Sequence, residues 1–266
     1  MKINEIIIRE SRVRSMERDA HQIVELLLKN CSDAIKGSHL YRGRYFSIEK
    51  FGYFDQKLVK NPREAANTSN YFNLLISNSP NWDNWPKRNR SILGSTSYEQ
   101  SRGYGSVSIV FPFNNVKIAL SPNHDFWESF PELETAFGYS FNDVDQINMA
   151  LEDIASHFEI QLNEFQFNIF ESQMKEIQNR LKTTDLKSDK DFYEYYQPII
   201  EKLLKYKDPM KFLFKITDPK LNNFKLFTTK NLEFDNEYEW WTEGPAYLVD
   251  YRFFRKKVEP LLKHGR

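Results

Sequence analysis

The stretch that most constrains the fold of this chain is SILGSTSYEQSRGYGSVSIVFP, residues 91–112. Its pattern predicts a strand, a polar turn, a short helix and a second strand. Ser95, Thr96 and Ser97 form the turn, so we expect three hydroxyl groups where the first strand ends. Ser97 has the chemistry of a helix N-cap, because its hydroxyl can accept a hydrogen bond from a free backbone N–H. The two strands must then share a core, around which the remaining chain is arranged.

Two short pieces elsewhere in the sequence complement this stretch. LYRGR, residues 40–44, places Arg42 on a short apolar run. NEYEWW, residues 236–241, carries Glu237 and Glu239 with one residue between them. Carboxylates at that spacing face the same way on a strand. The chain therefore presents an arginine, a Ser-Thr-Ser turn and a pair of glutamates, in that order.

The composition is that of a well-packed globular protein. The chain has 266 residues, with 22 Phe and 14 Tyr but only 9 Gly, which suits one large domain or one domain with an insertion. Lys plus Arg and Asp plus Glu both number 37, so the net charge does not indicate a strongly basic nucleic-acid binder. Cys31 is the single cysteine, which excludes an internal disulfide and a multi-cysteine zinc site. We expect Cys31 to be a small buried residue.

Neither a membrane span nor a metal site is indicated by the sequence. No apolar run reaches the roughly 20 residues that cross a bilayer, and the segment MKINEIIIRE lacks the apolar core of a signal peptide. The five histidines show no metal-ligand spacing. We therefore expect a cytoplasmic protein that uses no metal and contacts no membrane.

The apolar periodicity predicts a mixed α+β protein. Helices are expected at 15–36, 67–75, 98–102, 143–182, 190–206 and 256–263, and strands at 39–46, 107–111, 116–120, 211–216, 225–228, 238–241 and 246–251. The turn residues Asn114 and Asn115 predict a hairpin between the strands at 107–111 and 116–120. We expect one domain over residues 1–266, with the helical block at about 125–206 as an insertion.

These residue types match what cleavage of the nicotinamide–ribose bond of NAD requires. An arginine fork holds phosphate or ribose oxygens, and a carboxylate stabilises the oxocarbenium-like transition state. A second carboxylate can orient or deprotonate the nucleophile, hydroxyl groups can support the first carboxylate, and aromatic rings can stack on nicotinamide. The candidates are Arg42; Ser95, Thr96 and Ser97; Glu237 and Glu239; and Tyr98, Tyr104 and Phe111.

Together the three pieces resemble the arginine, Ser-Thr-Ser, Glu-x-Glu group of ADP-ribosyltransferases, which includes clostridial toxins and phage-encoded enzymes. The resemblance rests on LYRGR, LGSTSYEQSRGYG and NEYEWW. It implies a split, mixed or antiparallel β core with flanking helices that clamps NAD. It also implies that Arg42 binds NAD phosphate or ribose, that Ser95 supports Glu239 as the catalytic glutamate, and that Glu237 acts on the acceptor side.

The function that the resemblance implies is mono-ADP-ribosyl transfer from NAD to a macromolecule. The acceptor is a protein side chain or a base of RNA or DNA in the bacterial host cytoplasm, and the enzyme acts as a toxin or as a phage modifier of the host. An antitoxin or a host protein is a further expected partner. Two alternatives stay open: an NAD glycohydrolase, and a non-catalytic phage or interaction protein that keeps the fold.

A second choice of acid also stays open at this point. The gap between Ser97 and Glu237 contains 139 residues, which is long for the family. Asp125 and Glu128 lie closer to the central stretch and are alternatives to Glu239.

Overall fold

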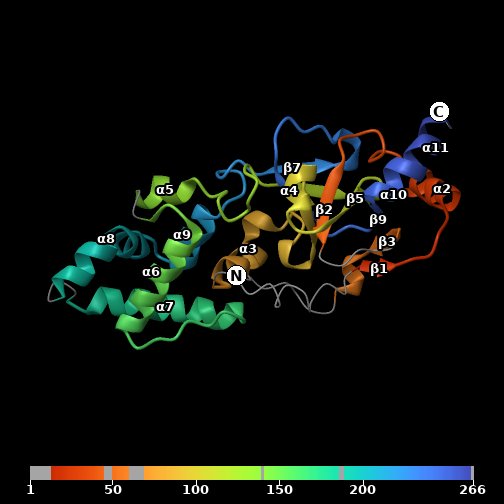
Figure 1. Ribbon diagram of the computed structural model, residues 1–266. Helices are drawn as coiled ribbons and strands as arrows, with labels where there is room; N and C mark the ends of the chain where they lie inside the picture. Colours follow the sequence, from red (N-terminus) through yellow and green to blue (C-terminus); the bar gives the residue numbers. More distant parts are fainter. Residues whose placement is uncertain (1–12, 45–49, 60–68, 139–140, 186–188, 265–266) are drawn as a thin grey trace. The chain divides into compact units, whose positions relative to one another are not determined.

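The computed structural model describes residues 13–44, 50–59, 69–138, 141–185 and 189–264. Over these residues the chain is mixed α+β, which confirms the predicted class. It divides into two compact units. Unit 1 comprises Met1–Ala66, Trp85–Phe126 and Phe224–Arg266, and unit 2 comprises Asn67–Asn84 and Trp127–Asn223. Figure 1 shows that the strands belong to unit 1, whereas unit 2 is helical.

Unit 1 is built on a single sheet of nine described strands, and every described pair in it is antiparallel. Their order across the sheet is β1-β3-β9-β5-β2-β4-β8-β6-β7. The strands are β1 Val13–Ser15, β2 Leu40–Arg44, β3 Phe51–Phe54, β4 Ile92–Ser95, β5 Ser106–Pro112, β6 Lys117–Leu120, β7 Lys225–Thr228, β8 Glu239–Thr242 and β9 Ala246–Asp250. Most neighbours in the sheet are distant in sequence, so the sheet is held together by long-range pairing.

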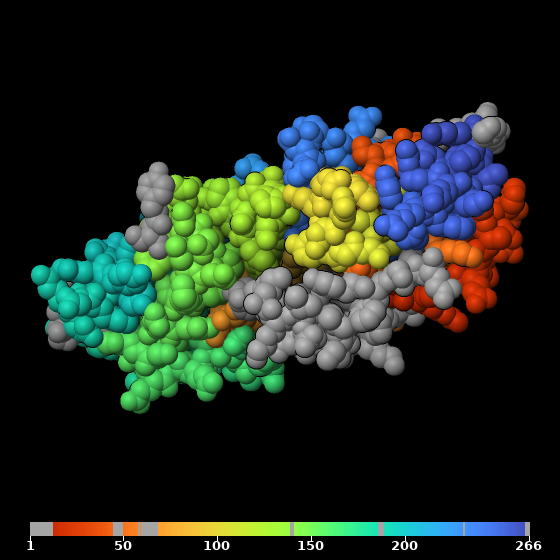
Figure 2. All heavy atoms as spheres, in the orientation of Figure 1, coloured from red at the N-terminus to blue at the C-terminus, as the bar shows by residue number. Residues whose placement is uncertain are grey.

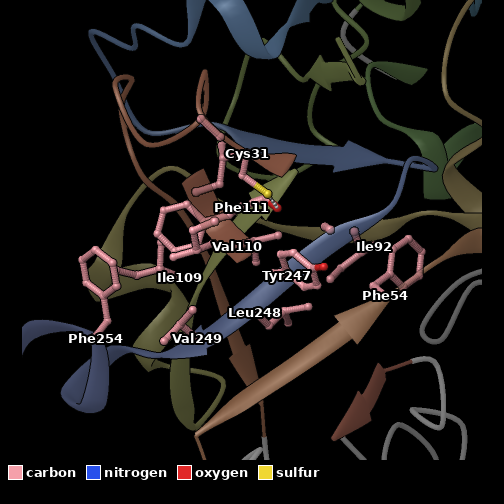
Figure 3. Packing of buried hydrophobic residues seen from close by; sticks show 14 of the residues in the cluster. Cys31, Phe54, Ile92, Ile109, Val110, Phe111, Tyr247, Leu248, Val249 and Phe254 are labelled. Atoms are coloured by element: carbon pink, nitrogen blue, oxygen red, sulfur yellow. Dashed lines mark hydrogen bonds between the residues drawn. The ribbon is translucent and has the colours of Figure 1, made fainter. Parts of the chain in front are cut away.

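The core of unit 1 centres on β5 and β9, whose side chains are buried on both faces of the sheet. Figure 3 shows Ile109, Val110 and Phe111 packed with residues of β9. Cys31 lies in the same cluster, where its thiol donates to the carbonyl of Phe111 at 3.3 Å. Burial raises the pKa of this thiol well above its ordinary value, so Cys31 is the small buried residue that the sequence predicts.

Helices complete unit 1 around this sheet. They are α2 Ala20–Asn30, α4 Tyr98–Arg102, α10 Tyr251–Phe253, the π-helical turn η7 Phe254–Val258 and α11 Glu259–His264, with short 3₁₀ turns η1 Gln56–Leu58, η3 Arg88–Arg90 and η6 Thr229–Asn231. Asp19 caps α2 through a capping box with Gln22. Figure 2 shows the yellow segment that contains α4 at the surface, beside the dark blue C-terminal helices. Tyr98 and Tyr251 make this contact, with ring centroids 4.4 Å apart.

Unit 2 is a helical unit with its own aromatic core. Its elements are α3 Tyr71–Asn78, η2 Pro80–Trp82, α5 Glu132–Phe137, α6 Val144–His157, α7 Phe167–Thr183, α8 Lys190–Lys205 and α9 Pro209–Ile216. Tyr71 on α3 stacks on Phe170 of α7. The indole of Trp82 donates to the carbonyl of Thr217 at 2.7 Å. The helices expected at 125–206 lie in this unit, which also contains α3 and α9; their status as an insertion into one domain stays a prediction.

The predicted hairpin between the strands at 107–111 and 116–120 is wrong. Both segments are strands, and Asn115 takes the turn conformation with φ 63°. However, β5 pairs with β2 and β9, whereas β6 pairs with β7 and β8. Alternating apolar residues predict a strand but do not tell which neighbour it pairs with, because the partner is chosen by packing across the whole sheet.

The segment 211–216, predicted as a strand, lies instead in helix α9. Asp208 caps this helix by accepting the N–H of Met210 at 3.0 Å, and Pro209 occupies the first turn. Asp followed by Pro is a helix-start signal that outweighs the short apolar run after it. Five residues of α9, all apolar, are buried, which stabilises the helix through packing.

Other element boundaries shift by a few residues. The helix expected at 15–36 is confined to α2, and the long helical pattern at 143–182 is divided into α6 and α7. The break contains Glu159, which has a φ of 58° that a helix interior does not allow. Residues 45–46 of the strand expected at 39–46 and residues 67–68 of the helix expected at 67–75 lie outside the described residues.

A substitution at Gly43 tests how closely α4 packs against the sheet. A Cβ atom at this position would lie 1.8 Å from the carbonyl oxygen of Ser101 and 2.8 Å from Cβ of Tyr104. We expect Gly43→Ala to lower the free energy of unfolding by about 1–3 kcal/mol, because α4 must move away from β2. Urea denaturation followed by circular dichroism measures this change.

Gly103→Ala is the matched control for Gly43→Ala. Gly103 has helical backbone angles, and the nearest atom to its added Cβ is the carbonyl oxygen of Gln100 at 3.2 Å. We expect a change within about 1 kcal/mol of the wild-type value. An equal loss in both variants would contradict the tight packing of α4 on Gly43.

Candidate functional site

The three sequence pieces lie on three consecutive strands of the sheet. The arginine piece forms β2, the Ser-Thr-Ser turn follows β4, and the Glu-x-Glu pair enters β8. Sheet order places β4 between β2 and β8. Ser95 lies directly opposite Tyr41 on one side and Glu239 on the other. Segments separated by much of the chain therefore meet at one end of β4.

Thr96 joins the Ser-Thr-Ser turn to the glutamate segment through three hydrogen bonds. Its N–H donates to the carbonyl of Tyr238 at 2.9 Å, and its hydroxyl oxygen accepts the N–H of Tyr238 at 2.8 Å. The same hydroxyl donates to the carbonyl of Asn236 at 3.1 Å. These contacts hold the backbone on both sides of Glu237. The middle residue of the turn thus positions the first glutamate.

Ser95 is connected to Glu237 through the side chain of Gln100 on α4. The Ser95 hydroxyl donates to Oε1 of Gln100 at 2.7 Å, and Nε2 of Gln100 donates to Oε2 of Glu237 at 2.9 Å. Ser97 caps α4, as the sequence predicts, by accepting the N–H of Gln100 at 3.4 Å. All three residues of the turn therefore contribute to this end of the sheet.

An open pocket of about 520 Å³ lies at this end of the sheet in unit 1. It is lined by Ser38, His39, Tyr41, Thr96, Phe234, Asp235, Asn236 and Glu237. Its volume lies within the range of small-molecule sites. Thr96 and Glu237 are the predicted site residues in this lining, and both belong to the motifs that define the site.

The pocket lining contains two carboxylates and a histidine with a lowered pKa. A hydrogen bond from the Tyr238 hydroxyl to Asp235, 2.7 Å long, lowers the pKa of that carboxyl group. Burial lowers the pKa of His39, and this effect exceeds the opposing charge of Glu259. His39 packs edge-on against the rings of Tyr41, Phe111 and Phe254. A ligand in the pocket therefore meets two exposed carboxylates and a largely neutral imidazole ring.

Arg42 is buried in β2, where its Nη1 donates to the carbonyl of Leu93 on the neighbouring strand. Side chains alternate along a strand, so Arg42 and Tyr41 point to opposite faces of the sheet. Arg44 shares the face of Arg42 and is also buried. The structure thus brings the arginine strand, but not the Arg42 guanidinium, to the pocket lining, and a phosphate-binding role for Arg42 stays a prediction.

Glu239 forms an ion pair rather than lining the pocket. Its Oε1 accepts from Nη2 of Arg88 at 2.8 Å and from Nε at 3.1 Å, and its Oε2 accepts the N–H of Phe126 at 3.2 Å. The two charged side chains are only 11% and 16% exposed. The guanidinium of Arg88 lies 4.2 Å from the ring centroid of Phe126. Glu239 is therefore held on both carboxylate oxygens, whereas Glu237 is exposed.

The three aromatic candidates have different environments. Tyr98 contacts Tyr41 edge-on and packs at a tilt against Tyr251, close to the pocket wall. Tyr104 is 61% exposed at the end of α4. Phe111 is 1% exposed and packs against Phe254 in the core, so the structure gives no support for stacking of a ligand on Phe111.

The alternative acids, Asp125 and Glu128, fall in different units. Asp125 is half-buried in the loop after β6, next to Phe126, whose N–H binds Glu239. Glu128 is exposed and belongs to unit 2. Among the described residues that line the pocket, neither appears. Their role as substitutes for Glu239 stays a prediction.

Sequence reasoning missed Gln100 and His39 in this region, and it named Arg88 only as a candidate for an anionic cleft, not as the partner of Glu239. Gln100 lies three positions after Ser97, which is the capping-box spacing, so a local signal for a polar role was present. Arg88 and His39 carry no comparable signal, because their partners are distant in sequence. Their contacts depend on the order of the strands in the sheet.

No protein-family profile, curated protein or solved structure matches this chain. Within the described residues, no group of three or more histidine, cysteine or carboxylate side chains is placed to hold a metal ion. Among the helices that the structure describes, none has both the length and the apolarity needed to cross a bilayer.

The ion pair of Glu239 with Arg88 is expected to stabilise the fold. Glu239→Gln keeps the shape of the side chain but removes the negative charge that Arg88 contacts in a largely buried place. We expect the free energy of unfolding to fall by about 2–4 kcal/mol. Urea denaturation followed by tryptophan fluorescence measures the loss.

Glu99→Gln is the control for this substitution. Glu99 pairs with Arg102 at 3.6 Å, and both side chains are more than two-thirds exposed (73% and 68%). Exposed ion pairs contribute little to stability, so we expect the free energy of unfolding to change by less than about 1 kcal/mol. Equal effects of the two substitutions would show that the pair of Glu239 with Arg88 is not a structural anchor.

Stability is expected to depend on the protonation of His39. The folded protein keeps the pKa of His39 below its ordinary value of about 6.5, so the unfolded chain binds the proton more readily. Acidification through pH 6.5 therefore favours unfolding, and this contribution to stability is recovered as the pH rises above 6.5. Between pH 7.5 and 5.5, we expect the wild type to lose more unfolding free energy than His39→Asn. Identical pH slopes in urea denaturation would contradict this assignment.

Proposed function

We propose that this protein is a mono-ADP-ribosyltransferase that transfers ADP-ribose from NAD to a macromolecular acceptor. One observation carries the proposal: the arginine, Ser-Thr-Ser and Glu-x-Glu pieces, far apart in sequence, lie in or directly beside the adjacent strands β2, β4 and β8. If the three short motifs resembled those of the family by chance alone, they would not be expected to lie side by side in the sheet. The direct contacts of Thr96 and Gln100 with the glutamate segment add support.

The chemistry of the pocket suits the ribosyl carbon of NAD better than its phosphates. Asp235 and Glu237 provide negative charge beside the pocket, and this charge stabilises an oxocarbenium-like transition state. In the reaction, the bond between C1′ of the ribose and the nicotinamide nitrogen breaks, and nicotinamide leaves with the electron pair. The acceptor nucleophile forms the new bond to C1′ and gives its proton to a base or to water.

Within this proposal we assign contact with the ligand to Glu237 and a positioning role to Glu239. The resemblance assigns the catalytic role to Glu239, but both oxygens of that carboxylate are already hydrogen-bonded and its side chain is 16% exposed. Glu237 is exposed and lines the pocket. Glu239 anchors the start of β8 and thereby fixes the strand that Glu237 precedes.

The distribution of charge between the units also supports an anionic ligand for unit 1. Unit 1 contains 26 of the 37 Lys and Arg residues and 18 of the 37 Asp and Glu residues, so its net charge is +8. Unit 2 contains the remaining 11 basic and 19 acidic residues and has a net charge of −8. A positive unit attracts a dinucleotide over long range, while the local carboxylates act at the reacting carbon.

The proposal includes the fold type and the cellular role. The antiparallel sheet of unit 1 would be the NAD-binding core of an ADP-ribosyltransferase, and unit 2 would be a helical insertion into it. The acceptor would be a protein side chain or a nucleic-acid base in the cytoplasm of a bacterial host, with the enzyme acting as a toxin or phage-encoded modifier.

Release of nicotinamide from NAD, measured with bacterial lysate as the source of acceptors, tests the proposal. We expect Glu237→Gln to reduce kcat by about 100-fold or more, because the substitution removes the charge that stabilises the transition state. We expect Glu239→Gln, assayed at a temperature where it stays folded, to reduce kcat by about 10-fold or less. Circular dichroism of each variant confirms that it is folded.

The pattern of results separates the alternatives. Label from NAD on protein or nucleic acid indicates transfer, whereas free ADP-ribose without labelled polymer indicates an NAD glycohydrolase. Absence of NAD consumption by the wild type in every lysate rejects both enzymes and favours a non-catalytic interaction protein. A large decrease of kcat in Glu239→Gln with little decrease in Glu237→Gln would assign the catalytic role to Glu239.

A further inference from the structure

Gln100 occupies a particular place between the central turn and the pocket. It lies on α4, is half-buried, and has a side chain that reaches from Ser95 to Glu237. Its backbone N–H is held by the Ser97 hydroxyl, so the position of the residue on the helix is set by the N-cap. Gln100 lies within LGSTSYEQSRGYG, but the resemblance assigns it no role.

The orientation of the Gln100 amide follows from its neighbours. The N–H of Ser97 donates to the Ser95 hydroxyl oxygen at 3.0 Å, which directs the Ser95 hydroxyl hydrogen to another acceptor. That acceptor is Oε1 of Gln100, at 2.7 Å. An ionised carboxylate only accepts hydrogen bonds, so the Nε2 side of the amide must face Glu237. The hydrogen bond from Ser95 and the hydrogen bond to Glu237 therefore require the same orientation of the amide.

We infer that Gln100 is a positioning residue that holds the Glu237 carboxylate toward the pocket; the inference rests on the proposed function for its catalytic consequence. Thr96 holds the backbone on both sides of Glu237, and Gln100 holds its side chain. A hydrogen bond to an ionised group is stronger than one between neutral groups. An exposed glutamate that would otherwise sample several rotamers is thereby kept in one of them.

Three substitutions separate positioning from general stability. Gln100→Glu is nearly isosteric and keeps an acceptor for Ser95, but it removes the donor to Glu237. Gln100→Leu removes both contacts. Glu99→Gln changes the adjacent residue on α4. The side chain of Glu99 pairs with Arg102 and takes no part in the hydrogen bonds that connect Ser95, Gln100 and Glu237.

Steady-state kinetics of NAD turnover provide the first measurement. We expect kcat to fall by about 10-fold to 100-fold in Gln100→Glu and Gln100→Leu, because a misplaced reacting group costs rate without loss of substrate binding. The KM for NAD should change by less than about 2-fold, and Glu99→Gln should match the wild type. Wild-type kcat in both Gln100 variants would overturn the inference while leaving the proposed function intact.

Nuclear magnetic resonance provides a second measurement that does not depend on activity. The side-chain amide signal of Gln100 is identified by its loss in Gln100→Leu. We expect this signal to shift in Ser95→Ala and in Glu237→Gln, and to stay unchanged in Glu99→Gln. If the wild type turns over no NAD but the signal shifts as expected, the proposed function fails and the positioning of Glu237 stands. A signal that moves in neither variant overturns the inference.

Discussion

The candidate site depends on the pairing of β4 with two strands that come from opposite ends of the chain. β2 lies on one side of β4 and β8 on the other, with Tyr41, Ser95 and Glu239 in register. Gly94 allows this close approach, because a Cβ atom there would lie 2.0 Å from the carbonyl oxygen of Tyr41. Where β4 ends, its turn residues are free to bind the neighbouring segment, and Thr96 does so through three hydrogen bonds.

The two glutamates of the Glu-x-Glu pair show how position in a sheet separates chemically identical groups. Glu239 begins β8 and pairs with Arg88 over the ring of Phe126, in a largely buried place where the charge serves the fold. Glu237 precedes the strand, is exposed, and receives a hydrogen bond from Gln100. A carboxylate that acts on a ligand needs access to that ligand, and this requirement favours Glu237. The spacing of the pair in the sequence does not distinguish the two environments.

Local patterns predicted much of unit 1 correctly. The cap by Ser97, the helix α4 after it and the burial of Cys31 all follow from short-range chemistry. The secondary-structure prediction was wrong where a sequence pattern was compatible with both a helix and a strand. The short apolar run at 211–216 suited a strand, but Asp208 and Pro209 start a helix there, and packing of its apolar face decides the outcome. The strand β3 was missed because its four residues contain a glycine and give too short a pattern.

The sequence by itself determined that the chain is α+β, that residues 95–97 form a polar turn before a short helix, and that three pieces could form one site. These properties depend on neighbours within a few positions along the chain. Only the tertiary structure decided that β2, β4 and β8 are adjacent, that Gln100 connects Ser95 to Glu237, and that Arg88 holds Glu239. Strand order is set by the packing of the whole core, and contacts between residues distant in sequence leave no local signal from which they could be predicted.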